Sequence, residues 1–151
     1  MSKPLAVNDA DFDEKVLKAT NPVFVDFWAT WCAPCVREMP ALDRLQAGLT
    51  GEKIVVVALS IDRGGLPVVE EFYRRNGIET LPARIVPPGP LIDALGITVM
   101  PTTLLVNGDG NEVGRVVGTA EWDLPGALSF LRGCLVEAPA SASVPGSKPG
   151  S

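Results

Sequence analysis

Residues 24–36 read FVDFWATWCAPCV, and this stretch decides the fold. Residues 23–28 are almost continuously apolar, which is typical of a β-strand that is buried on both faces. Pro34 then stands where a helix over residues 34–48 is expected to begin, because the missing N–H of proline does no harm in the first helical turn. The two cysteines of the stretch therefore lie where a buried strand passes into a helix.

The rest of the chain alternates strands with helices. Helices between the first strands favour parallel pairing through right-handed crossovers, and the sequence GDG at residues 108–110 predicts an antiparallel hairpin. The sequence therefore predicts an α/β fold with a central mixed β-sheet flanked by helices on both faces. The predicted strands are 3–7, 23–28, 53–61, one within 81–90, 102–107 and 112–117; the predicted helices follow Asn8 or Asp9 and cover 34–48, 67–76, 91–95 and 122–136.

The length of 151 residues corresponds to about one domain. We expect this domain at residues 1–137, followed by a flexible tail rich in proline, serine and glycine at residues 138–151. The net charge of −5 argues against a nucleic-acid partner. No apolar run approaches the roughly 20 residues that a membrane-spanning helix needs. We expect a monomer without a membrane segment in this sequence.

The chain has three cysteines and no histidine. Without histidine, Ser-His catalysis, Cys-His catalysis and a Cys₂His₂ zinc site are excluded. Three thiols are too few for a Cys₄ zinc site, and their odd number argues against a framework made only of structural disulfides. We therefore expect no bound metal and no bound cofactor, and chemistry that is carried by cysteines or carboxylates.

Cys32 and Cys35 form a C-x-x-C pair at the predicted start of a helix. The N-terminus of a helix carries a partial positive charge and unpaired N–H groups, and both favour the thiolate, which is the nucleophile. Cys32, nearer the open end, would attack a partner's disulfide; Cys35, deeper in the helix, would then attack Cys32 and release the reduced partner. The third cysteine, Cys134, is expected to pack as a small apolar side chain.

Asp26 interrupts the apolar strand. Residues 24, 26 and 28 share one face of a strand, so Asp26 should be buried beneath the cysteines, and its burial should raise its pKa. A carboxyl group with a raised pKa can accept the proton of Cys35 when that thiol must attack. The alternative is a hydrogen-bonded structural acid near a strand end; we favour the catalytic role because the thiols lie beside it.

The segment VDFWATWCAPC resembles the active-site segment of the thioredoxin superfamily, in which WC-x-PC follows an acid in an apolar strand. A second resemblance is the sequence MPT at residues 100–102. It implies that Pro101 is cis and lies against the cysteines, and that Met100 lines the groove that binds the partner. From the residues alone, Pro101 is a proline at a strand start. The residues that the resemblance implies for substrate binding are Trp31, Ala33, Pro34, Met100 and Pro101.

Two branches of the superfamily are represented. The part up to residue 29 is similar to general thioredoxins, whereas WCAPCVREMPALDRLQ and MPTTLLVNGDGNEVGRVVG are similar to the TlpA/ResA branch. That branch often has asparagine in place of Asp26. General thioredoxins often have a lysine near the buried acid, where this chain has Ala58. In ResA-like proteins an acidic residue after the third strand tunes the cysteines; Asp62 lies close to that position but Arg63 lies nearer to it, so the role is left open.

The TlpA/ResA resemblance implies a thiol–disulfide oxidoreductase that reduces protein disulfides, serves cytochrome c maturation or copper-site assembly, and receives electrons from an upstream reductant. It also implies a periplasmic location with a leader or anchor that this sequence lacks, since the N-terminal residues show no signal-peptide pattern. A general cytoplasmic thioredoxin is one alternative. A Cu(I)-handling module is another, because two thiolates suit Cu(I). A third is a structural module that no longer turns over.

Overall fold

The computed structural model describes residues 5–6, 21–49 and 51–137, and within them the chain forms a six-stranded sheet in the order β1-β4-β3-β2-β5-β6. β2 pairs parallel with β3 and antiparallel with β5, and β6 extends the antiparallel edge. The strands are β1 (Leu5–Ala6), β2 (Val23–Trp28), β3 (Val55–Ser60), β4 (Arg84–Ile85), β5 (Thr102–Val106) and β6 (Glu112–Val117). The predicted mixed sheet with a hairpin at its edge is confirmed.

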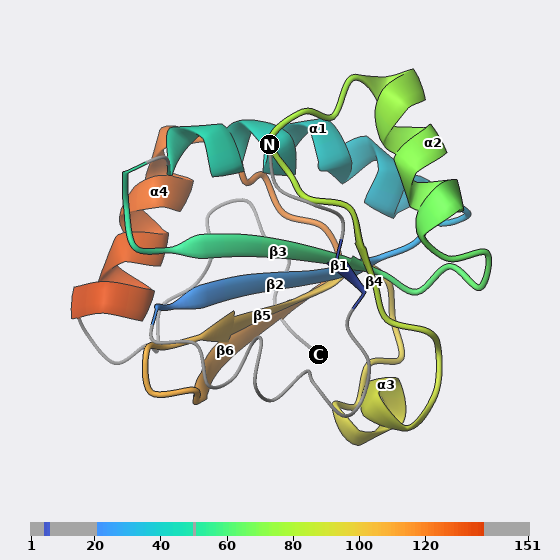
Figure 1. Ribbon diagram of the computed structural model, residues 1–151. Coiled ribbons are helices and arrows are strands. Elements are labelled where there is room, and N and C mark those ends of the chain that lie inside the picture. The colour runs from blue at the N-terminus through green and yellow to red at the C-terminus, as the bar shows by residue number, and fades with distance from the viewer. Residues whose placement is uncertain (1–4, 7–20, 50, 138–151) are drawn as a thin grey trace.

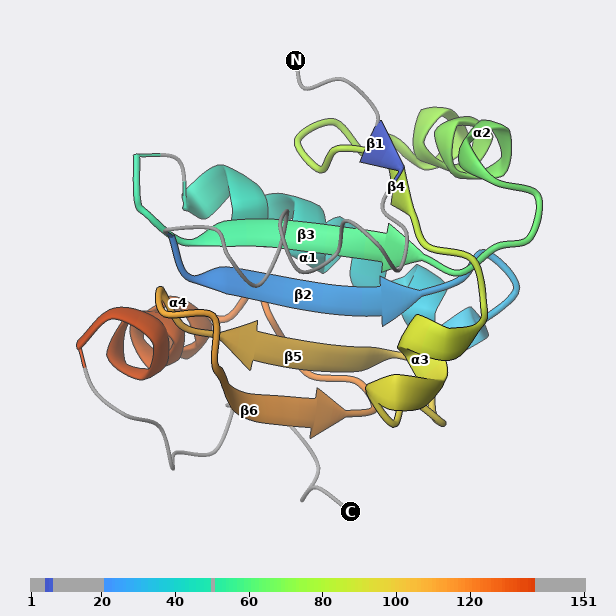
Figure 2. The same cartoon turned by 60° about the horizontal axis from the view of Figure 1, so that its bottom comes forward.

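Helices lie on both faces of this sheet. Figure 1 shows α1, α2 and α4 on one side of the strands and α3 on the other, and Figure 2 shows β3, β2, β5 and β6 side by side with α1 behind them. The α/β architecture with helices on both faces is therefore confirmed. The helices are α1 (Ala33–Gly48), α2 (Leu66–Asn76), α3 (Pro90–Ala94) and α4 (Pro125–Arg132), which continues as a π-helical turn at Gly133–Glu137.

β2 lies at the centre of the sheet, and all six of its residues are buried. At its start, the ring of Phe24 packs edge-on against Trp122, with 4.6 Å between the ring centroids. At its end, Trp28 contacts Phe72 and Tyr73 of α2. Aromatic contacts therefore cover both ends of one face of β2, and the residue between them on that face is Asp26.

The last helix differs from the sequence prediction. It begins at Pro125 instead of residue 122, because a residue before proline avoids helical backbone angles and Leu124 is extended, with ψ of 148°. Trp122 therefore lies in the preceding loop, where it is fully buried. Of the other predictions, β3 is shorter than 53–61 and α1 starts one residue early. The helix predicted after Asn8 and the tail predicted at 138–151 lie outside the described residues.

No helix among the described residues has the length and apolar character that crossing a bilayer requires.

Candidate active site

Cys32 and Cys35 form a disulfide at the N-terminus of α1, with 5.2 Å between their Cα atoms. Cys32 is the N-cap residue: its backbone is extended, and its Sγ accepts a hydrogen bond of 3.3 Å from the backbone N–H of Cys35. Pro34 lies in the first helical turn, as predicted. When the bond is reduced, the same N–H and the helix dipole would favour the thiolate of Cys32.

The two sulfur-bearing residues differ in accessibility. Cys32 keeps 7% of its surface exposed and Cys35 only 1%, so a partner reaches Cys32 first. Around them, Trp31 is 68% exposed, Ala33 is exposed and Pro34 is half-buried. These three residues therefore surround the more accessible sulfur at the surface, which is where the sequence places the partner.

The Met100–Pro101 peptide bond is cis. Thr102, the next residue, pairs with Phe27 of β2, so this segment lies beside the end of the strand that leads to the cysteines. Pro101 is buried, its carbonyl accepts the N–H of Gly118 at 2.8 Å, and Met100 is half-buried. The fold thus brings Met100 and Pro101 next to the strand end from which the disulfide turn starts.

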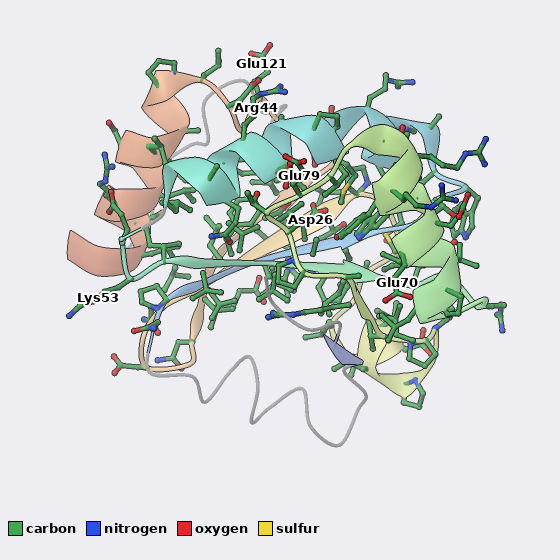
Figure 3. All side chains as sticks on the ribbon, turned by 45° about the horizontal axis from the view of Figure 1, so that its top comes forward. Asp26, Arg44, Lys53, Glu70, Glu79 and Glu121 are labelled. Carbon is green, nitrogen blue, oxygen red and sulfur yellow. A yellow bond between two sulfur atoms is a disulfide. The ribbon has the colours of Figure 1, made fainter. Side chains whose placement is uncertain are left out.

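Asp26 is buried as predicted, with 1% of its surface exposed. Figure 3 shows it in the layer between the sheet and α1. Its Oδ1 accepts a hydrogen bond of 3.1 Å from the hydroxyl of Thr103, whereas its Oδ2 has no hydrogen-bond partner. Burial raises the pKa of Asp26 well above its usual value, and the nearby carboxyl of Glu38 adds to this. Ala58 lies opposite Asp26 on β3, so no lysine from that position compensates the charge.

Glu38 is a second buried acid, which the sequence analysis missed. It is 5% exposed, although a glutamate side chain on a helix is usually exposed and charged at neutral pH. The signal was present: Cys35, Glu38, Leu42 and Leu45 follow helical spacing, so Glu38 falls on the buried face of the helix. The two acids, one from β2 and one from α1, therefore face the same interior layer beneath the disulfide.

The carboxyl of Glu38 is only partly satisfied. Its Oε2 accepts the backbone N–H of Ala120 at 2.8 Å, whereas Oε1 has no partner in hydrogen-bond geometry, although the nearby indole N–H of Trp122 lowers the pKa of the carboxyl. Burial raises the pKa of Glu38 to about 7, although the Ala120 bond opposes the shift. Glu38 also lines a groove of about 670 Å³ between α1 and residues 119–123, which reaches Pro34. Glu38 thus lies between the interior of the site and its surface.

The stability of the oxidised protein should fall as the pH rises from 5 to 8. The folded pKa of Glu38, about 7, lies above its unfolded value of 4.5, so its contribution is complete below pH 4.5 and is lost as the pH rises through 7. This contribution amounts to roughly 3 kcal/mol, so the Glu38→Gln variant should lose correspondingly less stability over this range. Denaturant unfolding at several pH values measures the difference.

The control for this measurement is Glu121→Gln, which changes an exposed acid of the same groove. It should follow the wild-type curve. Parallel curves for the wild type and Glu38→Gln would show that Glu38 does not titrate in this range.

Cys134 lies apart from this site. It is buried in the π-helical turn Gly133–Glu137 that follows α4, and burial raises its pKa, as expected for a packed thiol. Among the described residues, no three side chains of histidine, cysteine, aspartate or glutamate group closely enough to hold a metal ion.

A strand-to-helix turn with an N-capping, partly accessible disulfide cysteine defines a thiol–disulfide exchange site. Comparisons with known proteins agree. The thioredoxin family model matches residues 3–86. The chain is 47% identical to a thioredoxin of Rhodospirillum rubrum over 75 residues, which are 50% of this chain and 69% of that protein. The chain therefore belongs to the thioredoxin family.

Further relatives include thioredoxins and also thiol–disulfide oxidoreductases of a more specific type. The chain is 31% identical to the thiol–disulfide oxidoreductase ResA of Bacillus thuringiensis over 64% of its own length, and it spans 54% of that protein. It is similar to the structure of a putative thiol:disulfide interchange protein DsbE from Chlorobium tepidum, with a TM-score of 0.62, 28% identity, and coverage of 74% and 78% of the two chains. These matches favour the ResA/DsbE branch over a general thioredoxin. This chain is a thiol–disulfide oxidoreductase of the ResA/DsbE type.

Proposed function

We propose that the protein reduces disulfide bonds of partner proteins through reversible opening and closing of the Cys32–Cys35 disulfide. The observation that carries this proposal is the position of that disulfide: it caps a helix, and one of its two cysteines is more accessible than the other. The relatives named above are a thiol–disulfide oxidoreductase and a putative thiol:disulfide interchange protein, which supports exchange chemistry at this pair.

The exchange takes two steps. The thiolate of Cys32 attacks a sulfur of the partner's disulfide, forms a mixed disulfide, and displaces one partner thiolate. Cys35 then loses its proton and attacks Cys32, which releases the second partner thiolate and leaves the Cys32–Cys35 disulfide. The partner gains two electrons and two protons. An upstream dithiol must return two electrons before the next cycle.

Asp26 is proposed as the base in the second step. Its raised pKa brings the carboxylate closer to the proton affinity of a thiol, and efficient proton transfer needs such matching. Its unpaired Oδ2 leaves one acceptor free. Glu38 raises the pKa of Asp26 further, so the two acids do not readily carry charge at the same time.

The surface around Cys32 is proposed to bind the partner's chain. Trp31 offers a large exposed ring, and the Met100–Pro101 segment lies beside the end of β2. An extended partner segment placed there would bring its disulfide against Cys32. Ala33 and Pro34 belong to the same surface because they follow Cys32 in the first helical turn.

We propose a periplasmic location and, in line with the ResA resemblance, partners in cytochrome c maturation or copper-site assembly. A cytoplasmic thioredoxin role is the alternative. In intact cells, a membrane-impermeant thiol reagent would label Cys32 in the first case and fail to label it in the second.

The proposal is tested by the redox equilibrium of the cysteine pair. We expect a reduction potential closer to the about −270 mV of thioredoxin than to the about −120 mV of DsbA, and reduction of insulin disulfides with dithiothreitol as electron donor. The protein is equilibrated in graded thiol buffers and alkylated, and labelled cysteines are counted by mass, with Cys134 as the internal control.

Two outcomes would contradict this expectation. A potential near that of DsbA would make the protein an oxidant. A pair that stays reduced in every buffer would contradict exchange altogether, and stoichiometric Cu(I) binding by the reduced pair would then be the function to measure.

A further inference from the structure

Asp62 is a buried carboxylate to which the exchange steps assign no role. It follows the end of β3 and is 5% exposed. Its carboxylate accepts three hydrogen bonds: from the backbone N–H of Thr30 at 2.9 Å, from the hydroxyl of Thr30 at 2.6 Å, and from the hydroxyl of Ser60 at 2.6 Å. Hydrogen bonds to a charged acceptor are stronger than those between neutral groups, so this cluster is a firm attachment.

The residue that Asp62 holds belongs to the turn between β2 and α1. Thr30 stands one residue before the exposed Trp31 and two before Cys32. A second bond, from the N–H of Cys32 to the carbonyl of Ala29 at 3.1 Å, closes the same turn. The Asp62 carboxylate therefore fixes the point from which the accessible sulfur and the exposed indole project.

Asp62 also starts the segment that leads to α2. Its backbone carbonyl accepts the N–H of Gly65 at 3.2 Å, one residue before the helix. Thr30 and α2 form the two walls of a groove of about 660 Å³. The side chain of Asp62 thus holds Thr30, which forms one wall, and its backbone begins the segment that leads to α2, which forms the other. The residues that line the groove are Thr30, Pro67, Val68, Glu71, Phe72, Arg75 and Asn76.

We propose that Asp62 is a positioning residue that fixes Trp31 and Cys32 relative to the α2 wall, so that a polypeptide partner can bind along this groove while its disulfide meets Cys32. This inference rests on the proposed function and extends the partner-binding surface from Trp31 and the Met100–Pro101 segment to the groove between Thr30 and α2. A small disulfide needs only an accessible Cys32, whereas a protein disulfide must also fit the surface around it. The role of Asp62 should therefore be visible mainly with protein partners.

The test compares Asp62→Asn with the wild type on two substrates. Asparagine keeps the shape but replaces one acceptor oxygen with an NH₂ group. If the NH₂ group stands in place of Oδ1, the Thr30 hydroxyl loses its acceptor; if it stands in place of Oδ2, the Thr30 N–H and the Ser60 hydroxyl both lose theirs. We expect kcat/KM for insulin reduction to fall on the order of tenfold to a hundredfold, mainly through KM. The rate at which the reduced protein attacks dithiobis-nitrobenzoate, a small disulfide, should stay within about twofold.

Asp43→Asn is the matched control. Asp43 also holds a loop through a threonine, since its carboxylate accepts the backbone N–H and the hydroxyl of Thr80, but Asp43 lies about two helical turns beyond Cys35 on α1. It should leave both rates unchanged. Within the Asp62 cluster, Thr30→Val should reproduce part of the loss in kcat/KM for insulin because the hydroxyl disappears. Thr30→Ser keeps a hydroxyl and should therefore reduce insulin like the wild type.

Amide hydrogen exchange reports the positioning without any turnover. In Asp62→Asn, the N–H of Thr30 should exchange faster, whereas amides in the centre of β2 should keep their protection. Equal losses on both substrates, or unchanged insulin reduction in a variant whose Thr30 amide is loosened, would overturn the role of Asp62. A wild type that attacks the small disulfide but never reduces insulin would instead overturn the proposed function.

Discussion

The Cys35→Ser variant should hold its partner covalently through Cys32. Cys32 can still attack a disulfide, but the thiol that would release the partner is absent, so the mixed disulfide accumulates. If Cys35 acts at an effective concentration of only about 1 M, then external thiol at about 1 mM replaces it roughly a thousandfold more slowly. Non-reducing electrophoresis and mass spectrometry after mixing with insulin would show an adduct that dithiothreitol removes.

The Cys32→Ser variant is the control for this trap. It keeps Cys35, which is almost fully buried, and Cys134, which is buried elsewhere, so it should form no adduct and reduce no insulin. A stable adduct on Cys35 in this variant would reverse the assigned order of the two thiols. Adducts of similar amount in both variants would show that the accessibility of Cys32 does not decide which sulfur attacks.

The central part of the fold follows from the sequence because its patterns are local. The apolar run at residues 23–28 predicts β2 with its bounds correct, and the segment 112–117 does so for β6. The helix predicted at 67–76 ends as predicted, because Gly77 follows it with a left-handed backbone, φ of 67°, which glycine adopts without strain. In each case a few neighbouring residues contain the whole signal.

The environment of the cysteines could be predicted only in part. Asp26 interrupts an apolar strand, so its burial could be inferred from β2 alone. Glu38 lies on a helix with other charged residues, and its burial depends on the loop that supplies the N–H of Ala120, far along the chain. The attachment of Thr30 to Asp62 likewise joins two turns that are 32 residues apart. Contacts of this kind depend on tertiary structure, which periodicity does not encode.

Asp26 and Glu38 together make this site unlike a site with either acid alone. Two buried carboxyl groups that repel one another leave a proton on one of them over a wide pH range, because ionising both would place two charges in the same interior layer. Glu38 lines a groove at the surface, whereas Asp26 does not. Glu38 therefore lies between Asp26 and solvent, where it could accept the proton that Asp26 takes from Cys35.

The Asp26→Asn variant should release partners slowly near neutral pH. Asparagine can still accept the hydrogen bond of Thr103, but it cannot accept the proton of Cys35, and general base catalysis typically contributes about 10²- to 10⁴-fold. At alkaline pH, Cys35 ionises unaided, so the rates of variant and wild type should converge. Rapid-quench measurement of mixed-disulfide decay from pH 5 to 10 gives both rates. A loss of equal size at every pH would point to a structural role for Asp26.

The stability of the same variant provides an independent test. The folded pKa of Asp26 lies above its unfolded value, so the wild type is stabilised by this group at low pH and loses that contribution as the pH rises through the folded pKa. The asparagine side chain of the variant cannot ionise, so the variant should be the more stable protein at alkaline pH. Denaturant unfolding of both proteins at acidic and alkaline pH measures the difference.

Thr103→Val separates the base from its surroundings. The hydroxyl of Thr103 lowers the pKa of Asp26 by bonding to the carboxylate, so its removal should raise that pKa and move the pH profile of partner release to higher pH without abolishing it. An Asp26 that only fills space would leave the profile where it is. If the pH profile of partner release moves to higher pH in Thr103→Val, and if Asp26→Asn loses the fast release near neutral pH, the proton transfer is assigned to the carboxyl group of Asp26.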